Sequence, residues 1–518
     1  MYSGEQHLSS KGLAIATTPE LLNRHGPVLH VDVRSAKNQP VFVGVARDFD
    51  VASYLKGTGH TRLVQVQYPI ALSTEEEKGT AGPLAAPATL DWWVTKANGS
   101  GPQSIAWPIE DGPYDVVIMN ADGKTAPDVQ AELGIEIPKA FRTALAVFAG
   151  GILLLALGIL LILLRRRSVR PQAPGNIASG TPQAGALGDG RRSSPGVRRV
   201  VGLALVLGLV AGCSAIPQAD TVTSLTRPAI SDARAAAVIK HYNDLSDKAN
   251  SSLDAKPLTA VETGNVLRQS QAWYKIARAE KAKPGGTSAF LEPVIGSPQF
   301  GTYPMRFVSS SGIAGDKEYR HVGVWERATA GSPWMLVFSA GVKTAAKLPD
   351  ITSLRVATRA DDTKLAAGTQ GAASSLATYR TDGPKSARAA AFQPNADITE
   401  LFADIAKDKA EQAKERGSVR GITNTFSSPA ESPAFITKSG TAMVFVSLTQ
   451  DYTLLAGSNW QFWWESVPEA AFSPATAKYQ SGLTRTTIHD TVLLIPPKGQ
   501  GKIRIASFQS QVVDAGGY

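Results

Sequence analysis

The sequence predicts a multi-domain membrane protein with an N-terminal all-β sandwich, one transmembrane helix, a disordered linker, a second short hydrophobic segment and two α+β domains. Three observations predict this order: an uncharged apolar stretch at residues 143–164, a basic stretch rich in proline, glycine and serine at 165–199, and helical patterns followed by strand patterns after residue 217. The 518 residues, 43% of them hydrophobic, are enough to form several separate cores.

Residues 1–142 are expected to form the β-sandwich. Short runs with alternating or β-branched residues recur there, separated by turn formers such as Asn98-Gly99 and Asp111-Gly112-Pro113. Only residues 50–55 have a pattern typical of a helical turn. The predicted strands cover residues 28–34, 40–46, 61–67, 90–95, 104–109 and 114–119.

Residues 143–164 are the predicted transmembrane helix. This stretch has 22 residues without a charge, and a rise of about 1.5 Å per residue carries it across roughly 30 Å of hydrocarbon. Arg165, Arg166 and Arg167 follow it directly. Arginine-rich short loops stay in the cytoplasm, so we expect the linker 165–199 there. The linker lacks apolar periodicity and is therefore predicted to be disordered.

The second apolar segment, residues 200–216, contains the single cysteine of the chain, Cys213. Basic residues, a short apolar run and small residues before a cysteine are the parts of a secretory signal. Val210, Ala211 and Gly212 complete a sequence that resembles the lipobox of bacterial lipoproteins, in which the cysteine is lipidated. The basic residues before the segment are Arg191, Arg192, Arg198 and Arg199.

Two alternatives to a lipidated signal remain open for this segment. It is also compatible with a buried core helix, or with a second membrane span that contains an unmodified cysteine. A lipobox in mid-chain further suggests that two reading frames, one for a membrane protein and one for a lipoprotein, have been joined.

A cytoplasmic linker places both folded regions on the extracytoplasmic side of the cell membrane. Residues 1–142 would then cross the membrane during synthesis, yet the opening Met1-Tyr-Ser-Gly-Glu5 shows no signal helix. Either the true start lies further upstream, or the apolar segments insert the domain without a signal helix. If neither holds, residues 1–142 are cytoplasmic.

The formal net charge of +9 does not indicate nucleic-acid binding. Eight arginines and one aspartate between Arg165 and Arg199 supply seven of these charges, and they lie beside apolar segments, where membrane orientation and anionic lipids explain them. A single cysteine excludes a disulfide framework and metal sites built on several cysteines.

The C-terminal region is expected to contain two α+β domains, at residues 217–358 and 397–518, with a linker at 359–396. The first begins with helical patterns from Ser231 and from Val261, and strand patterns follow. The second begins with the capping-box-like Asp397-Ile-Thr-Glu400 and repeats the same order. This order of elements resembles two nuclear-transport-factor-2-like cone folds.

The chain as a whole resembles actinobacterial, streptomycete-type envelope membrane proteins joined to a lipoprotein with tandem cone-fold domains. The resemblance depends on residues 40–47 (PVFVGVAR), 50–55 (DVASYL), 113–123 (PYDVVIMNADG) and the lipobox. It implies a protein of the cell envelope.

No catalytic, cofactor or metal motif is found. The seven histidines form no HxxxH or HExxH spacing, and there is no glycine-rich phosphate loop or GxSxG sequence. Cone folds can enclose a polar pocket, which the resemblance assigns to Tyr242, Trp273, His321 and Trp325; ordinary aromatic core is the favoured alternative. Core packing is likewise favoured over sugar or partner binding for Trp92-Trp93 and for residues 460–464 (WQFWW).

We therefore expect a membrane-anchored extracytoplasmic envelope protein with a binding or scaffolding role and no enzymatic activity. Its expected partners are membrane lipid and an envelope protein or cell-wall component, and the sequence does not specify an oligomeric state. The competing hypothesis is an enzyme or small-ligand binder that uses a cone-fold pocket.

Overall fold

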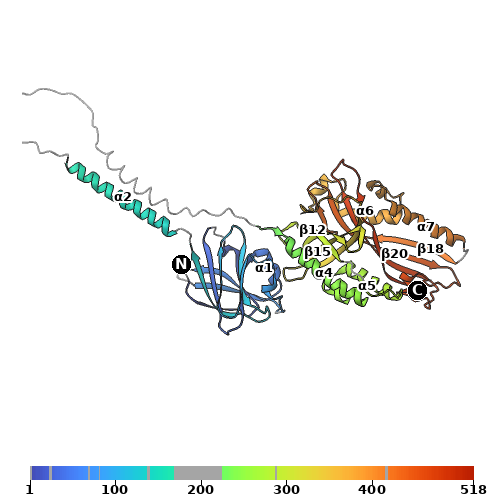
Figure 1. Ribbon diagram of the computed structural model, residues 1–518, viewed down its shortest axis with the longest axis horizontal. Helices are drawn as coiled ribbons and strands as arrows, with labels where there is room; N and C mark the ends of the chain where they lie inside the picture. The colour runs from blue at the N-terminus through green and yellow to red at the C-terminus, as the bar shows by residue number, and fades with distance from the viewer. Residues whose placement is uncertain are drawn as a thin grey trace, which may run out of the picture. The chain divides into compact units, whose positions relative to one another are not determined.

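The computed structural model describes residues 3–22, 26–67, 71–80, 82–136, 140–167, 224–285, 289–414 and 418–518 (Figure 1). The chain divides into two compact units, residues 1–48 with 57–224 and residues 49–56 with 225–518. The expected lipobox with Cys213, Val210, Ala211 and Gly212 lies outside the described residues, as do Arg191, Arg192, Arg198 and Arg199.

The N-terminal unit contains two β-sheets. One has four antiparallel strands in the order β1-β10-β3-β8, and the other has six strands in the order β6-β5-β2-β9-β4-β7. The sheets meet where Trp107 of β8 contacts Tyr114 of β9, with ring centroids 4.9 Å apart. The strands are β1 (Gln6–Ser9), β2 (Ile15–Thr17), β3 (Val28–Ser35), β4 (Val41–Arg47), β5 (His60–Gln67), β6 (Ala71–Glu77), β7 (Thr95–Gly99), β8 (Gln103–Pro108), β9 (Tyr114–Asn120) and β10 (Asp128–Glu136).

Burial along these strands follows their position in the sheets. Along β3, buried and half-buried residues alternate for most of its length, whereas every residue of the central strand β9 is buried. The six-stranded sheet differs from a purely antiparallel sandwich because β2 pairs with β5 in parallel. The expected helical turn is helix α1 (Asp48–Leu55), which directly follows β4.

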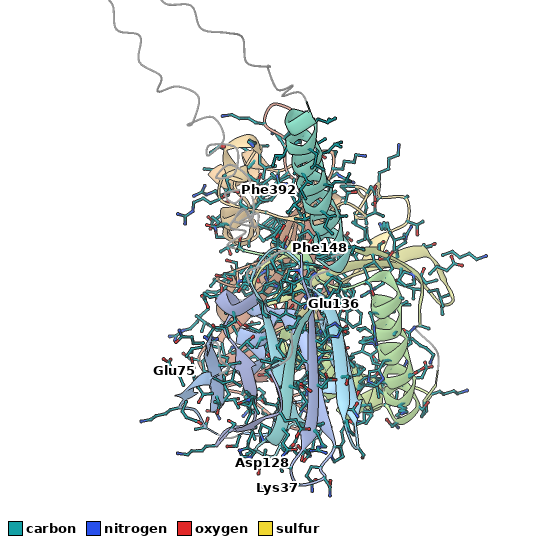
Figure 2. The ribbon with its side chains drawn as sticks, turned by 90° about the vertical axis from the view of Figure 1, so that its left-hand side faces the viewer. Lys37, Glu75, Asp128, Glu136, Phe148 and Phe392 are labelled. Atoms are coloured by element: carbon teal, nitrogen blue, oxygen red, sulfur yellow. The ribbon has the colours of Figure 1, made fainter. Side chains whose placement is uncertain are left out.

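Helix α2 (Ala140–Arg167) is long and apolar enough to cross a membrane. Its segment Val147–Leu164 has a mean hydropathy of 3.0, and none of that segment is buried inside the protein. Phe148 is 68% exposed. Figure 2 shows the helix beyond the Glu136 end of β10, while Asp128 at the other end of this strand pairs with Lys37 at 3.1 Å. A lipid environment would satisfy this exposed apolar surface.

The first half of the C-terminal unit has helices before strands. Helices α4 (Asp232–Ser252) and α5 (Gly264–Ala279) precede an antiparallel sheet in the order β12-β14-β15-β16. Their shared core includes Ile239, Phe307, Trp325 and Trp334. The strands are β11 (Arg227–Pro228), β12 (Phe290–Gly296), β13 (Gln299–Phe300), β14 (Met305–Ile313), β15 (Asp316–Arg327) and β16 (Met335–Lys343).

The second half repeats this order around a seven-stranded sheet. After the two-residue strand β17, helices α6 (Thr369–Asp382) and α7 (Ala396–Lys414) precede the remaining strands, and the long strands β20 and β21 form the centre of the sheet. A short helix α8 (Val467–Ala470) lies between these two strands in the chain. The strands are β17 (Arg355–Val356), β18 (Val419–Ser427), β19 (Ala434–Ile436), β20 (Ala442–Ala456), β21 (Gly482–Ile495), β22 (Arg504–Ile505) and β23 (Gln509–Gly517).

Helix α6 occupies residues that were expected to be a linker. Its sequence TQGAASSLATYRTD has no strong apolar face, which is why the pattern suggested a loop. Ala372, Ala373, Leu376 and Ala377 are nevertheless buried in the core of the second half. Small side chains allow the helix to lie close to the sheet, so burial stabilises it where amphipathicity is weak.

The sheets of the two halves share a hydrophobic core. Phe338 of β16 and Phe445 of β20 are part of it, with ring centroids 5.2 Å apart. Along β20, Met443 and Phe445 face this shared core, whereas Val444 and Val446 face the core beneath α6. Successive strand residues point to opposite faces, so the central sheet is buried on both sides.

Candidate functional site

Three of the four expected pocket residues come together inside the first half of the C-terminal unit. Tyr242 of α4 contacts Trp325 of β15 edge to face, with centroids 5.4 Å apart. The ring of Phe290 stacks on Tyr242 at 5.2 Å and on His321 at 3.6 Å. Trp273 of α5 is instead 48% exposed and contacts Tyr274. The structure thus brings together Tyr242, His321 and Trp325 and leaves Trp273 apart.

Polar groups line this aromatic cluster. The Tyr242 hydroxyl donates a hydrogen bond to Glu262 Oε1 at 2.8 Å, and Trp325 Nε1 donates to Ser309 Oγ at 2.9 Å. His321 Nε2 lies 3.1 Å from Ser339 Oγ. We call Tyr242, Glu262, Phe290, His321 and Trp325 the aromatic cluster.

Gly323 makes room for the imidazole ring of His321. A Cβ at this position would lie 2.7 Å from His321 Cε1 and 3.0 Å from Leu336 Cδ1. His321 and Gly323 are two residues apart on β15, so they share one face of the strand. A glycine is therefore required here for the ring to lie flat against Phe290.

Burial shifts the pKa of two titratable members of the aromatic cluster, His321 and Glu262, and raises that of a third, Tyr242, above its usual value. It lowers the pKa of His321 to about 3, so the imidazole is neutral at physiological pH. Burial also raises the pKa of Glu262 to about 7, against the opposing effect of hydrogen bonds from Ser270 and Tyr242. Sequence reasoning missed Glu262, because nothing in its spacing separates it from a surface glutamate in the loop before α5.

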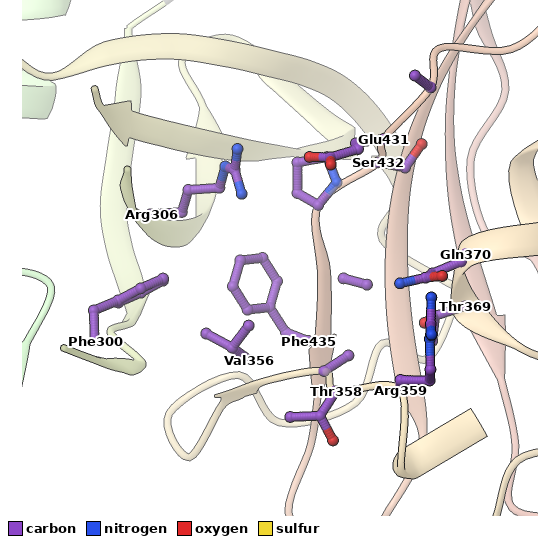
Figure 3. Close-up of a pocket in the computed structure, with 14 residues that line it drawn as sticks. Phe300, Arg306, Val356, Thr358, Arg359, Thr369, Gln370, Glu431, Ser432 and Phe435 are labelled. Atoms are coloured by element: carbon purple, nitrogen blue, oxygen red, sulfur yellow. The ribbon is translucent and has the colours of Figure 1, made fainter. Parts of the chain in front are cut away.

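A separate cavity of about 470 Å³ lies within the same unit (Figure 3). We call it the junction groove, because β13 and β14 of the first half and β17, α6 and β19 of the second half supply its lining. Phe300, Val356 and Phe435 form an apolar side. Figure 3 shows Arg359 with Thr369 and Gln370 on another side, and Glu431 with Ser432 on a third.

Asp361 and Asp362 fix the segment that carries Arg359. Asp361 binds the Arg355 guanidinium at 2.6 and 2.7 Å, and it accepts hydrogen bonds from the backbone N–H and hydroxyl of Thr358. The hydrogen bonds from Arg355 hold the pKa of Asp361 well below its usual value. Asp362 Oδ1 accepts from the backbone N–H and hydroxyl of Thr369 at 2.8 and 2.9 Å. Arg359 is therefore presented on an anchored loop.

The charged side chains of the junction groove differ in their partners. Arg306 is held by Glu326, with Nε and Nη2 at 2.7 and 2.6 Å from Oε2. Among the described residues, no ion pair is found for Arg359 or Glu431, and both side chains are exposed. The groove therefore presents one cation and one anion that a ligand can bind.

The tryptophan clusters differ in exposure. Trp92 and Trp93 are buried, with centroids 4.1 Å apart, as expected for core residues. Trp460 and Trp463 are 49% and 39% exposed, which differs from the expected core packing. Lys478 Nζ lies 3.2 Å from the ring centroid of Trp463, so this ring takes part in a surface cation–π contact.

In the part of the chain that the structure describes, no group of three or more His, Cys, Asp or Glu side chains is arranged to hold a metal ion. The C-terminal unit is thus defined by two packed α+β halves, an enclosed aromatic cluster and an open groove of mixed polarity. Residues 226–517 match the model of a family described as a domain of unknown function, DUF8094. The chain belongs to this family. Comparison with curated proteins and with solved structures found no match.

Proposed function

We propose that the protein is a membrane-anchored, extracytoplasmic component of the cell envelope that acts by binding and not by catalysis. The observation that carries this proposal is helix α2, whose segment Val147–Leu164 is apolar and unburied. Arg165, Arg166 and Arg167 end the helix, which favours an extracytoplasmic N-terminal unit. The open groove with exposed charges supports a binding role.

The proposal extends to the residues that follow helix α2 in the chain. Cys213 would carry a lipid that holds the C-terminal unit at the membrane, with Val210, Ala211 and Gly212 as the lipobox. The repeated order of helices before strands supports two nuclear-transport-factor-2-like halves. The proposed partners are membrane lipid and an envelope protein or cell-wall component.

Reporter fusions test the topology. Alkaline phosphatase, which is active only outside the cytoplasm, is inserted in frame into the full chain after residue 136 or near residue 180, or is fused after residue 518, so that helix α2 is retained in every fusion. Activity at the first and third positions with none at the second is expected. Activity only at the linker position would overturn the proposed orientation.

Mass analysis tests the lipid anchor. The chain and its Cys213→Ala variant are isolated from membranes after labelling with radioactive fatty acid. A lipidated fragment that begins at Cys213 and is lost in the variant is expected if two mature proteins arise from one chain. A single unlipidated chain of 54.6 kDa would make Cys213 an ordinary residue of an apolar segment.

A second candidate function is binding of a small ligand, or catalysis, at the aromatic cluster. The specific observation is Glu262, a buried carboxyl group with a pKa of about 7 beside the Tyr242 hydroxyl, because perturbed groups in enclosed sites are typical of active sites. Uptake of indole by the wild type and by Phe290→Ala tests this candidate. Saturable binding in the wild type supports it, whereas binding in neither protein argues against it.

A further inference from the structure

We propose that the junction groove binds a short zwitterionic peptide, with the ligand carboxylate at Arg359, its ammonium group at Glu431 and an apolar side chain on Phe300, Val356 and Phe435. This inference rests on the proposed binding function and names the class of ligand. The inference goes beyond the proposed membrane anchor, because the ligand of the groove is argued without any feature of α2 or of Cys213.

The size and polarity of the groove match a ligand of this class. Its volume of about 470 Å³ falls in the range of roughly 300–1,000 Å³ that is typical of small-molecule sites. The apolar side formed by Phe300, Val356 and Phe435 can bury a hydrophobic side chain. The remaining sides are polar, so a purely hydrophobic ligand would leave them without partners.

The charges favour a zwitterion over an anion. Glu326 neutralises Arg306 at 2.6 Å, so Arg306 adds little attraction for a second carboxylate. Arg359 and Glu431 carry opposite charges and line different sides of the groove (Figure 3). A ligand with only negative charge would pair with Arg359 but be repelled by Glu431. A ligand with both charges satisfies both side chains.

Neutral hydrogen-bonding groups in the groove suit a peptide bond. The hydroxyls of Thr358 and Thr369 already donate to Asp361 and Asp362. Ser432 Oγ is buried and has no hydrogen-bond partner among the described residues. The amide of Gln370 also lines the groove. Ser432 and Gln370 can therefore exchange hydrogen bonds with the N–H and C=O of a peptide unit.

The test uses the dipeptide alanyl-phenylalanine and two blocked forms, its N-acetyl derivative and its C-terminal amide. Binding to the full chain in lipid nanodiscs is measured by isothermal titration calorimetry. The free dipeptide is expected to bind, and blocking either end is expected to weaken binding by about threefold or more, because each blocked form loses one ion pair with a solvent-exposed side chain.

Two variants assign each end of the ligand to its side chain. Arg359→Gln should remove the preference for the free dipeptide over its C-terminal amide while keeping the preference over the N-acetyl form. Glu431→Gln should do the opposite. Both side chains are exposed, so the variants should fold, which thermal unfolding checks. Arg388→Gln and Glu400→Gln, at exposed positions outside the groove lining, are the matched controls and should bind as the wild type does.

Absence of dipeptide binding, or equal binding of free and blocked forms, would overturn the assignment of the ligand. Equal losses in the groove variants and the control variants would overturn the assignment of the site. Neither result bears on the reporter fusions, so failure of this inference remains distinguishable from failure of the proposed envelope function.

Discussion

Glu262 should make the C-terminal unit less stable as the pH rises. The side chain is 1% exposed, and burial raises its pKa from 4.5 to about 7. The folded protein therefore holds the proton more tightly than the unfolded chain does. The stability that the protonated group provides is fully present below about pH 4.5 and is lost as the pH rises through about 7.

The size of this effect follows from the pKa difference. One pKa unit corresponds to about 1.4 kcal/mol, so ionisation of Glu262 in the folded protein costs about 3 kcal/mol relative to the unfolded chain. Glu262→Gln keeps an acceptor for the Tyr242 hydroxyl but cannot ionise. The variant should match the wild type within about 1 kcal/mol at pH 5 and exceed it by about 3 kcal/mol at pH 8.

Thermal unfolding of the full chain in detergent, followed by tryptophan fluorescence, measures the difference. About 3 kcal/mol corresponds to a Tm increase of roughly 6–12 °C at pH 8 for a unit of this size. Glu280→Gln, an exposed position just after α5, is the control and should shift Tm little at either pH. A Tm difference between Glu262→Gln and wild type that stays constant from pH 5 to pH 8 would refute the reasoning.

Four further substitutions test the packing. Trp325→Ala removes a fully buried ring and should lower the free energy of unfolding by about 3–5 kcal/mol. Trp460→Ala, at the surface, should change the free energy of unfolding by less than about 0.5 kcal/mol. Denaturant titration measures both changes. Gly323→Ala places a Cβ 2.7 Å from His321 Cε1 and should lower the free energy of unfolding by about 1–3 kcal/mol. This loss should appear as a lower urea midpoint, and an unchanged midpoint would contradict the close packing. Phe445→Ala, in the core shared by the two halves, should destabilise both halves together. Amide hydrogen exchange should then accelerate in both β15 and β21, and acceleration confined to one half would contradict a shared core.

Local sequence patterns predicted the elements that depend on local sequence alone. The uncharged stretch 143–164 lies within helix α2 (Ala140–Arg167), which is long and apolar enough to cross a membrane. The expected turn at 50–55 is part of α1 (Asp48–Leu55). Helix α7 begins at Ala396, close to the expected start, and Asn395 Oδ1 accepts a hydrogen bond from the N–H of Ile398 at 3.1 Å.

The junction groove could not be predicted in the same way. Its lining comes from β13, β14, β17, α6 and β19, segments that meet only when the two halves pack together. Neither Arg359 nor Glu431 belongs to a motif, and Arg359 lies in a stretch that composition marked as a linker. A site formed by tertiary packing leaves no spacing rule in the sequence.

Aromatic residues likewise show the limit of composition. Trp92 and Trp460 both occur in tryptophan-rich runs, yet the first is 3% exposed and the second 49%. Which side of a strand or loop faces the core depends on neighbours that are distant in the chain. Exposure of Trp460 follows from that context and not from the run itself.

The central sheet, buried on both faces, limits how the chain can be divided. Strand β20 places Met443 and Phe445 against the first half and Val444 and Val446 beneath α6. A fragment cut between the halves would expose one of these faces to water, and an exposed apolar sheet face is a template for aggregation. Expression of either half alone should therefore give insoluble protein. Duplication, deletion or exchange of one half during evolution would therefore require compensating changes in the face that the other half presents to β20.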